Sequence, residues 1–129
     1  MAWNSFLKNF IGGEQNEAAE LDNTTDNNGA VRNENLSGRA FKKQLEAAEK
    51  AVLLDVRTAG EFSGGTIPGS KNIDFLSPTF STNVKKLDKD ATYFLFCRSG
   101  NRSGQACKIM HSMGFDVRNL SGGIGEFPA

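Results

Sequence analysis

A cysteine at the end of an apolar run is the residue of this chain best placed to do chemistry. Cys97 directly follows the run 93–96, and a glycine-containing segment that can start a helix comes after it. If the run is a buried strand, backbone N–H groups and the positive end of a helix dipole point at the sulfur. Such surroundings favour the thiolate, which is the nucleophilic form of cysteine. The sequence therefore predicts an activated thiol.

The residues after the thiol can form a small anion-binding loop. Gly100 permits a tight curl that turns successive amides inward. Arg98 and Arg102 add positive charge, which favours the thiolate and attracts an anionic substrate, while serine hydroxyls supply further donors. The predicted site loop consists of Arg98, Ser99, Gly100, Asn101, Arg102 and Ser103.

Neither histidine nor a metal is expected to activate this thiol. His111 is the only histidine and lies about two helical turns beyond the loop, so a cysteine–histidine pair is poorly supported. Cys107 and His111 are four residues apart, but two ligands without a third do not make a metal site. We predict no metal and no cofactor, and activation by amides and arginines instead.

Strands that alternate with helices must position this loop. The segments 51–54 and 92–96 are predicted to be buried strands, and shorter or later strands are expected at 71–73 and 116–120. The alternation is typical of an α/β fold with a mostly parallel sheet and helices on both faces. Ligands of such sheets bind beyond the carboxyl ends of the strands, which is where Cys97 falls.

Helix signals fill the gaps between the predicted strands. Ser37 can cap a helix that ends near Lys50, and residues 59–62 can form a short helical turn. Ser77 followed by proline is a good start for a helix that runs to about residue 86. The helix after Cys97 has apolar residues at core-facing spacing and stops near Gly114.

Length and charge limit the domain count and the partners. The chain has 129 residues, enough for one ordinary core, and its fifteen Lys and Arg balance fifteen Asp and Glu. The balance argues against nucleic acid and anionic membrane as partners. Two cysteines are too few for a disulfide framework, so a reducing, cytoplasmic setting is expected. With no run of about 20 apolar residues, the protein should be soluble.

Three parts are predicted along the chain. Residues 1–11 carry an apolar stripe at helical spacing and should form a short amphipathic helix. Residues 12–35 are polar and are expected to be a flexible linker. Residues 36–129 should form the folded domain. The first helix is expected to dock on its own domain or on a protein partner, since Lys8 alone gives too little charge for membrane attachment.

Three separated motifs resemble the rhodanese homology domain, the family of single-domain sulfurtransferases. The first is the segment 53–57, followed by Glu61 and by 65–70; the second is the loop 97–102; the third is Gly114-Phe115 leading to 120–124. The resemblance covers roughly residues 36–127. It implies a three-layer fold with a mostly parallel central sheet of about five strands.

The resemblance also implies a reaction. Cys97 would take a sulfane sulfur from a donor such as thiosulfate, become a persulfide, and pass the sulfur to an acceptor such as cyanide or a thiol. The expected partners are therefore a small anionic sulfur donor and a thiol acceptor. Loop amides would hold the outer sulfur, and Arg98 and Arg102 would steer the donor. The residues implied to brace the loop are Asp55, Arg57 and Glu61.

Two positions depart from the family pattern. Thr66 stands where many relatives have histidine, and Phe127 where many have tryptophan. Both are interpreted as structural positions that do not threaten activity.

Two other functions stay open. A rhodanese-like domain can serve as a noncatalytic or weakly catalytic docking module in sulfur trafficking. A related fold also occurs in cysteine phosphatases. The resemblance to that group implies a loop with five residues between the cysteine and the arginine. Cys97 and Arg102 have four residues between them, which favours a ligand smaller than phosphate.

Overall fold

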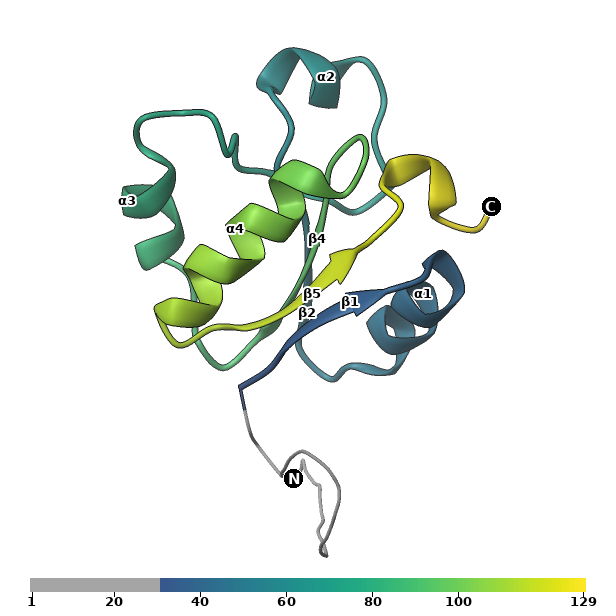
Figure 1. Ribbon diagram of the computed structural model, residues 1–129, viewed down its shortest axis with the longest axis horizontal. Coiled ribbons are helices and arrows are strands. Elements are labelled where there is room, and N and C mark those ends of the chain that lie inside the picture. The colour runs from purple at the N-terminus through teal and green to yellow at the C-terminus, as the bar shows by residue number, and fades with distance from the viewer. Residues whose placement is uncertain (1–30) are drawn as a thin grey trace, which may run out of the picture. The chain divides into compact units, whose positions relative to one another are not determined.

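A parallel five-stranded sheet organises residues 31–129, the part of the chain that the computed structural model describes (Figure 1). The spatial order of the strands is β1-β5-β4-β2-β3. The strands are β1 (Asn33–Leu36), β2 (Ala51–Asp55), β3 (Lys71–Asn72), β4 (Thr92–Phe96) and β5 (Asp116–Leu120). The helices are α1 (Gly38–Ala47), α2 (Ala59–Ser63), α3 (Phe80–Lys85), α4 (Asn101–Ser112) and the 3-10 turn η1 (Ile124–Glu126).

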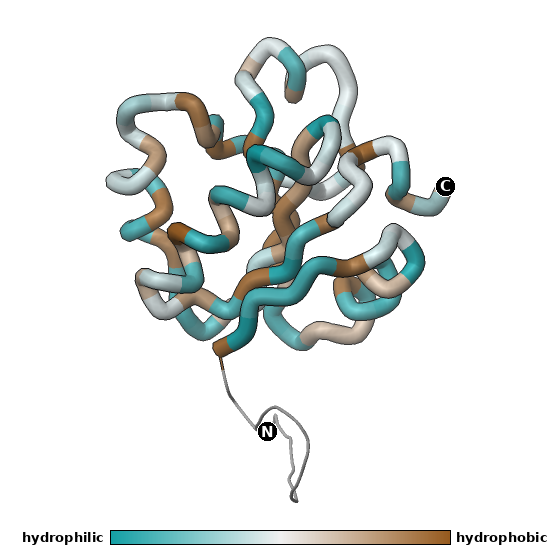
Figure 2. The backbone as a smooth tube through the Cα atoms, in the orientation of Figure 1, coloured by the Kyte–Doolittle hydropathy of each residue, from teal (hydrophilic) through white to brown (hydrophobic). Residues whose placement is uncertain are grey.

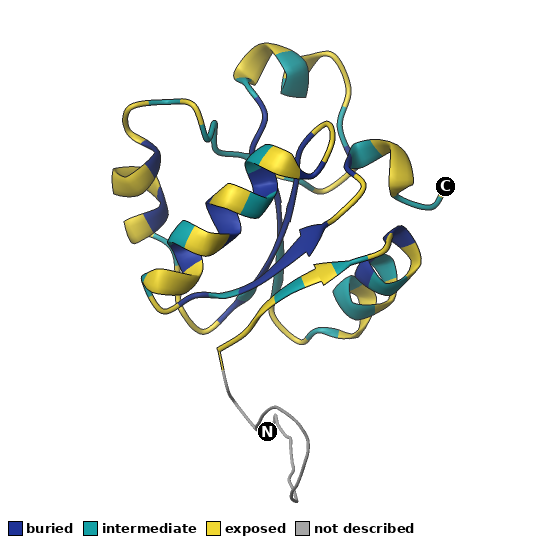
Figure 3. Cartoon of the chain, in the orientation of Figure 1, coloured by how far each residue is buried: buried dark blue, intermediate teal, exposed yellow. Residues whose placement is uncertain are grey.

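The central strand β4 separates two cores. Its side chains alternate, so Tyr93 and Leu95 pack with α3 and α4, while Phe94 and Phe96 pack with α1 and η1. Figure 3 shows the matching pattern on α4, whose sheet-facing side is buried and whose outer side is exposed. The sheet therefore has helices on both faces, and the predicted three-layer α/β fold is confirmed.

Strand β1 corrects the predicted linker boundary. Residues 33–35 were expected to belong to the linker 12–35, but they pair in parallel with β5, Asn33 opposite Val117 and Leu36 opposite Leu120. The strand is hydrophilic for most of its length (Figure 2), so no apolar pattern marks it. It forms because β5 offers its backbone groups as hydrogen-bond partners. The predicted helix 1–11 and the linker up to residue 30 lie outside the described residues.

Two helix ends also differ from the predictions. The helix α1 does begin after Ser37, whose hydroxyl accepts a hydrogen bond from the Ala40 amide, but it ends at Ala47 and not near Lys50. The helix predicted to start at Ser77 starts only at Phe80. There the Ser77 hydroxyl accepts from the Thr79 amide and closes a turn, which brings Phe80 against Phe75 in the core.

Candidate active site around Cys97

The loop after β4 wraps hydrogen-bond donors around the sulfur of Cys97. The amide of Gly100 donates to Sγ at 3.1 Å, and the amide and hydroxyl of Ser103 each donate at 3.4 Å. Gly100 has a φ of +94°, in the left-handed region that glycine adopts without strain. Amides that a helix start leaves without intrahelical partners are thus turned toward the thiol.

Burial and hydrogen bonding act in opposite directions on this thiol. Cys97 is 1% exposed, and burial by itself raises its pKa. The hydrogen bonds from the Ser103 hydroxyl and from the amides of Ser103, Ser99 and Gly100 lower it, and the net result is a pKa below the ordinary cysteine value. The structure therefore gives Cys97 the surroundings that favour a thiolate.

A second segment, residues 119–124, supports the loop from behind. The Ile124 amide donates to the Cys97 carbonyl at 2.8 Å, and Asn119 Nδ2 donates to the Gly100 carbonyl at 3.2 Å. Gly123 lies so close to the Arg98 carbonyl that a Cβ atom there would collide with it. The motif 120–124 did not by itself predict this supporting role, for which the paired glycines were the available signal.

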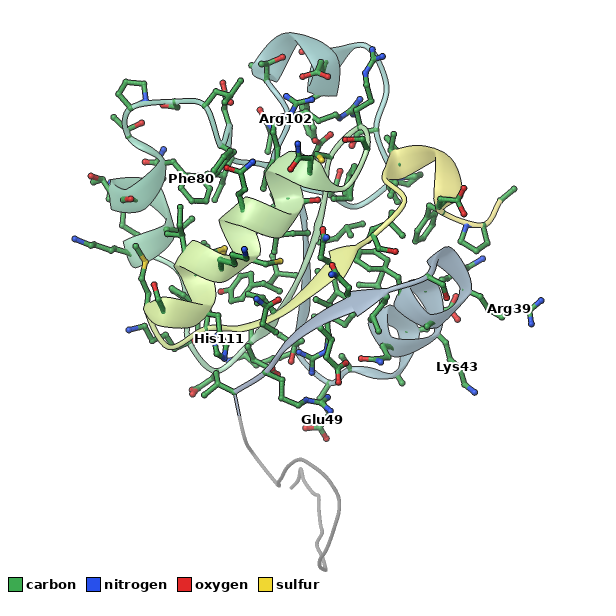
Figure 4. The ribbon with its side chains drawn as sticks, in the orientation of Figure 1. Arg39, Lys43, Glu49, Phe80, Arg102 and His111 are labelled. Carbon is green, nitrogen blue, oxygen red and sulfur yellow. The ribbon has the colours of Figure 1, made fainter. Side chains whose placement is uncertain are left out.

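Arg102 is held by Glu61 of α2. Its two terminal nitrogens bind the two carboxylate oxygens at 2.9 and 3.1 Å, and this pairing lowers the pKa of Glu61 to about 2. Glu61 also accepts from the Thr58 amide, which completes a capping box at the start of α2. Figure 4 shows Arg102 at the end of α4 that faces α2. The ion pair joins the start of α4 to α2.

Arg98 is the exposed cation of the loop. Its side chain is 79% exposed, and its Nε lies 3.9 Å from the Glu61 carboxylate that Arg102 already holds. The two remaining predicted loop residues make local hydrogen bonds. The Ser99 hydroxyl accepts from the Asn101 amide at 3.4 Å, and the Asn101 side chain accepts from Gln105 at 3.4 Å. Ser99 reaches the sulfur through its amide.

Asp55 and Arg57 brace the segment after α2. Arg57 binds the Asp55 carboxylate with Nη2 at 2.7 Å and donates to the Gly65 carbonyl at the same distance. Thr66 donates its hydroxyl proton to Asp55 at 2.9 Å. The three predicted bracing residues thus divide: Glu61 is linked to the site loop through Arg102, whereas the Asp55–Arg57 pair holds residues 65–66. Phe127, the other departure from the family pattern, packs edge-on against Phe41.

Two other residues with metal-binding chemistry lie apart from the thiol loop. Cys107 is fully buried on the inner side of α4, and burial raises its pKa to about 12. His111 lies near the opposite end of α4 from Arg102 (Figure 4). Within residues 31–129, no three His, Cys, Asp or Glu side chains are grouped as metal ligands would be. Over the same residues no helix has the length and apolar character needed to cross a membrane.

The fold and the loop together define a class, the parallel α/β domains whose central strand ends on an activated cysteine. The chain belongs to the rhodanese-like domain family, whose model matches residues 37–129. This confirms the family to which the three sequence motifs pointed.

Relatives and solved structures agree with this assignment. YtwF of Bacillus subtilis, assigned by name to the sulfurtransferases, is 37% identical over 89 residues, which cover 69% of this chain and 84% of YtwF. A human protein named thiosulfate:glutathione sulfurtransferase is 32% identical over 99 residues, covering 66% of this chain and 85% of the relative. The crystal structure of a rhodanese-like domain protein from Staphylococcus aureus matches with a TM-score of 0.64 at 26% identity, covering 74% of this chain and 91% of that one. These names support a sulfurtransferase-type function.

Proposed function

We propose that this protein transfers a sulfane sulfur from a small anionic donor such as thiosulfate to cyanide or a thiol, through a persulfide on Cys97. The observation that carries the proposal is the set of N–H and O–H donors around Sγ, which favours a thiolate at the carboxyl end of the central strand. The human relative, named for thiosulfate and glutathione, supports a donor and an acceptor of these classes.

The proposed reaction has two displacement steps. In the first, the Cys97 thiolate attacks the outer sulfur of thiosulfate, a new S–S bond forms, and sulfite leaves with the electron pair of the broken bond. In the second, a cyanide ion or a thiolate attacks the outer sulfur of the persulfide, and the Cys97 thiolate leaves. The enzyme ends in its starting redox state, so no outside oxidant or reductant is needed. The inward amides support the negative charge on the persulfide.

The two loop arginines have different roles in this proposal. Arg102 is occupied by a bidentate pair with Glu61 and orients the start of α4. Arg98 is exposed, and the nearby carboxylate is already held by Arg102, so its charge is the one available to attract an anionic donor. A thiol acceptor and two free cysteines fit a reducing compartment such as the cytoplasm.

Intact mass spectrometry tests the proposal. The protein is incubated with thiosulfate and weighed, then treated with cyanide and weighed again. We expect a gain of the mass of one sulfur atom that cyanide reverses, no gain in Cys97→Ser, and a normal gain in the matched control Cys107→Ser. A gain that survives in Cys97→Ser contradicts the mechanism. No gain with thiosulfate in the unaltered protein contradicts thiosulfate as donor and favours the docking module.

A further variant tests the role of charge. Arg98→Ala should lower kcat/KM for thiosulfate several-fold at low salt, with the difference shrinking as salt screens the charge. Arg39→Ala removes an exposed arginine from α1 and serves as the control. Equal kcat/KM values for Arg98→Ala and Arg39→Ala would show that Arg98 does not contribute to donor binding.

A further inference from the structure

Asn119 is a buried amide on β5, and its position is unexpected for a polar side chain. The residue is 4% exposed and lies on the same side of the strand as Val117, which packs in the core beneath α4. Its Oδ1 atom is buried and has no hydrogen-bond partner among the described residues. An unpaired buried acceptor costs free energy that an apolar side chain would not. Packing alone therefore does not explain an asparagine at this position.

The amide nitrogen of Asn119 joins the edge of the sheet to the active-site loop. Nδ2 donates to the Asn35 side-chain oxygen of β1 at 2.7 Å and to the Gly100 carbonyl at 3.2 Å. Because both partners are acceptors, the nitrogen and not the oxygen must face them. The Gly100 carbonyl also accepts the first helical hydrogen bond of α4, from the Gly104 amide at 3.0 Å. Asn119 thus holds the residue at which the loop becomes a helix.

Gly100 is the residue whose placement matters most to the sulfur. Its amide makes the shortest of the hydrogen bonds recorded to Cys97 Sγ, at 3.1 Å. It has no side chain with which to anchor itself, and its backbone lies directly on the Ser121 carbonyl, where a Cβ atom would collide. Glycine is the residue with the greatest backbone freedom, so its orientation depends on outside contacts.

We propose that Asn119 is a positioning residue for Cys97, which holds the Gly100 carbonyl and thereby keeps the Gly100 amide aimed at the sulfur. Asn119 acts through Gly100 on a thiol that it does not bind itself. The inference rests on the proposed function only in taking the thiolate as the working form of Cys97.

The charged and titratable groups around the thiol belong to other residues. Arg102, at the start of α4, and Cys107, deeper along α4, are coupled electrostatically to Cys97. Glu61 of α2 is paired with Arg102, and Arg98 is exposed on the loop. A substitution of the neutral Asn119 leaves all of these side chains in place. A change in the pH profile of Cys97 would therefore report on hydrogen bonding at the sulfur.

The test compares Asn119→Leu and Asn119→Ala with Asn35→Ala. The control removes the other partner of Asn119 and leaves its contact with Gly100. Alkylation of Cys97 by iodoacetamide is followed by intact mass across pH, with no sulfur donor present. We expect both Asn119 variants to raise the apparent pKa of Cys97 by about half a unit, which slows alkylation about threefold at pH values below both pKa values. Asn35→Ala should keep the original profile.

Two results overturn the inference. One is an unchanged profile in a folded Asn119 variant; the other is an equal shift in Asn35→Ala, which would assign the effect to the packing of β1 on β5. Thermal unfolding identifies the folded variants. Leucine keeps the branched shape of asparagine but is larger, while alanine is smaller and cannot clash, so either one decides if the other fails to fold. A protein that alkylates as expected but takes no sulfur from thiosulfate contradicts the proposed function and leaves the positioning role intact.

Discussion

Cys97 and Cys107 show how the same side chain in the same core can differ in chemistry. They are 1% and 0% exposed and belong to one apolar cluster. Yet the pKa of Cys97 is lowered, whereas burial raises that of Cys107 to about 12. Cys97 ends a strand where amides point inward, but Cys107 lies within α4, whose amides are used in helical pairing. The difference teaches that donors at the sulfur, and not exposure, lower the pKa of a buried thiol.

The largest expected effect is the difference in alkylation between the two cysteines. With a pKa of about 12, Cys107 has a thiolate fraction of about 10⁻⁵ at neutral pH, so iodoacetamide should prefer Cys97 by at least about a thousandfold. Peptide mapping after brief labelling of the native protein measures the ratio. Labelling in denaturant, where both thiols are ordinary, is the control. Comparable labelling of Cys97 and Cys107 in the native protein would contradict the proposed difference between the two thiols.

A substitution in the segment that supports the loop should make Cys97 less reactive toward alkylation, and so more like Cys107. Gly123 has a φ of +85°, and a Cβ atom would meet the Arg98 carbonyl, so Gly123→Ala should destabilise the loop by about 1–3 kcal/mol. Alkylation of Cys97 should then slow about tenfold or more. Gly125→Ala is the matched control, since a Cβ atom there has no neighbour within 4 Å. Equal rates in the two variants would mean that 119–124 does not support the site.

Removing one donor from the sulfur gives a smaller effect. Ser103→Ala deletes the hydroxyl that lowers the pKa of Cys97, so the pKa should rise by about one unit. Alkylation should fall about tenfold at pH values below both pKa values and converge with the original rate above them. Ser99→Ala is the control, because Ser99 reaches the sulfur through its amide, which alanine retains. A pH-independent loss in Ser103→Ala would indicate misfolding instead.

The smallest effect is expected from the ion pair between Glu61 and Arg102. Glu61 has its folded-state pKa lowered to about 2 by Arg102, below an ordinary value of about 4.3. The pairing therefore stabilises the fold above the ordinary pKa, and this contribution is lost as the pH falls toward about 2. Glu61→Gln should be less stable at neutral pH and should lose less stability on acidification. Denaturant unfolding across that pH range measures the free energy of unfolding of both proteins. If the two plots of this free energy against pH run parallel, the ion pair contributes nothing to stability.

Much of the fold could be predicted from the sequence because the strongest sequence patterns are local. The apolar run of β4, the core-facing residues of α4 and Gly100 in the loop each act within a few residues, and the structure has them where they were predicted. Strand β1 was missed because its side chains are polar. It exists only through pairing with β5, whose residues lie far along the chain.

The candidate site was predicted where its contacts are short-range and missed where they are long-range. Cys97 and the loop amides could be found because the donors follow the thiol directly. The pairing of Arg102 with Glu61 joins residues 41 positions apart, and Asn119 reaches Gly100 from the next strand. No spacing rule reveals such contacts, so the sequence did not show which arginine remains exposed.

The support of the loop by Gly123 and Ile124 has a consequence for protein synthesis. Because those residues follow Cys97 in the chain, a ribosome produces the cysteine before the backbone that holds its loop. A nascent chain stopped before Leu120 would present an ordinary thiol, and alkylation of such a truncated chain can measure this. The lowered pKa of Cys97 would then arise only once residues 121–124, which follow the last strand, have emerged.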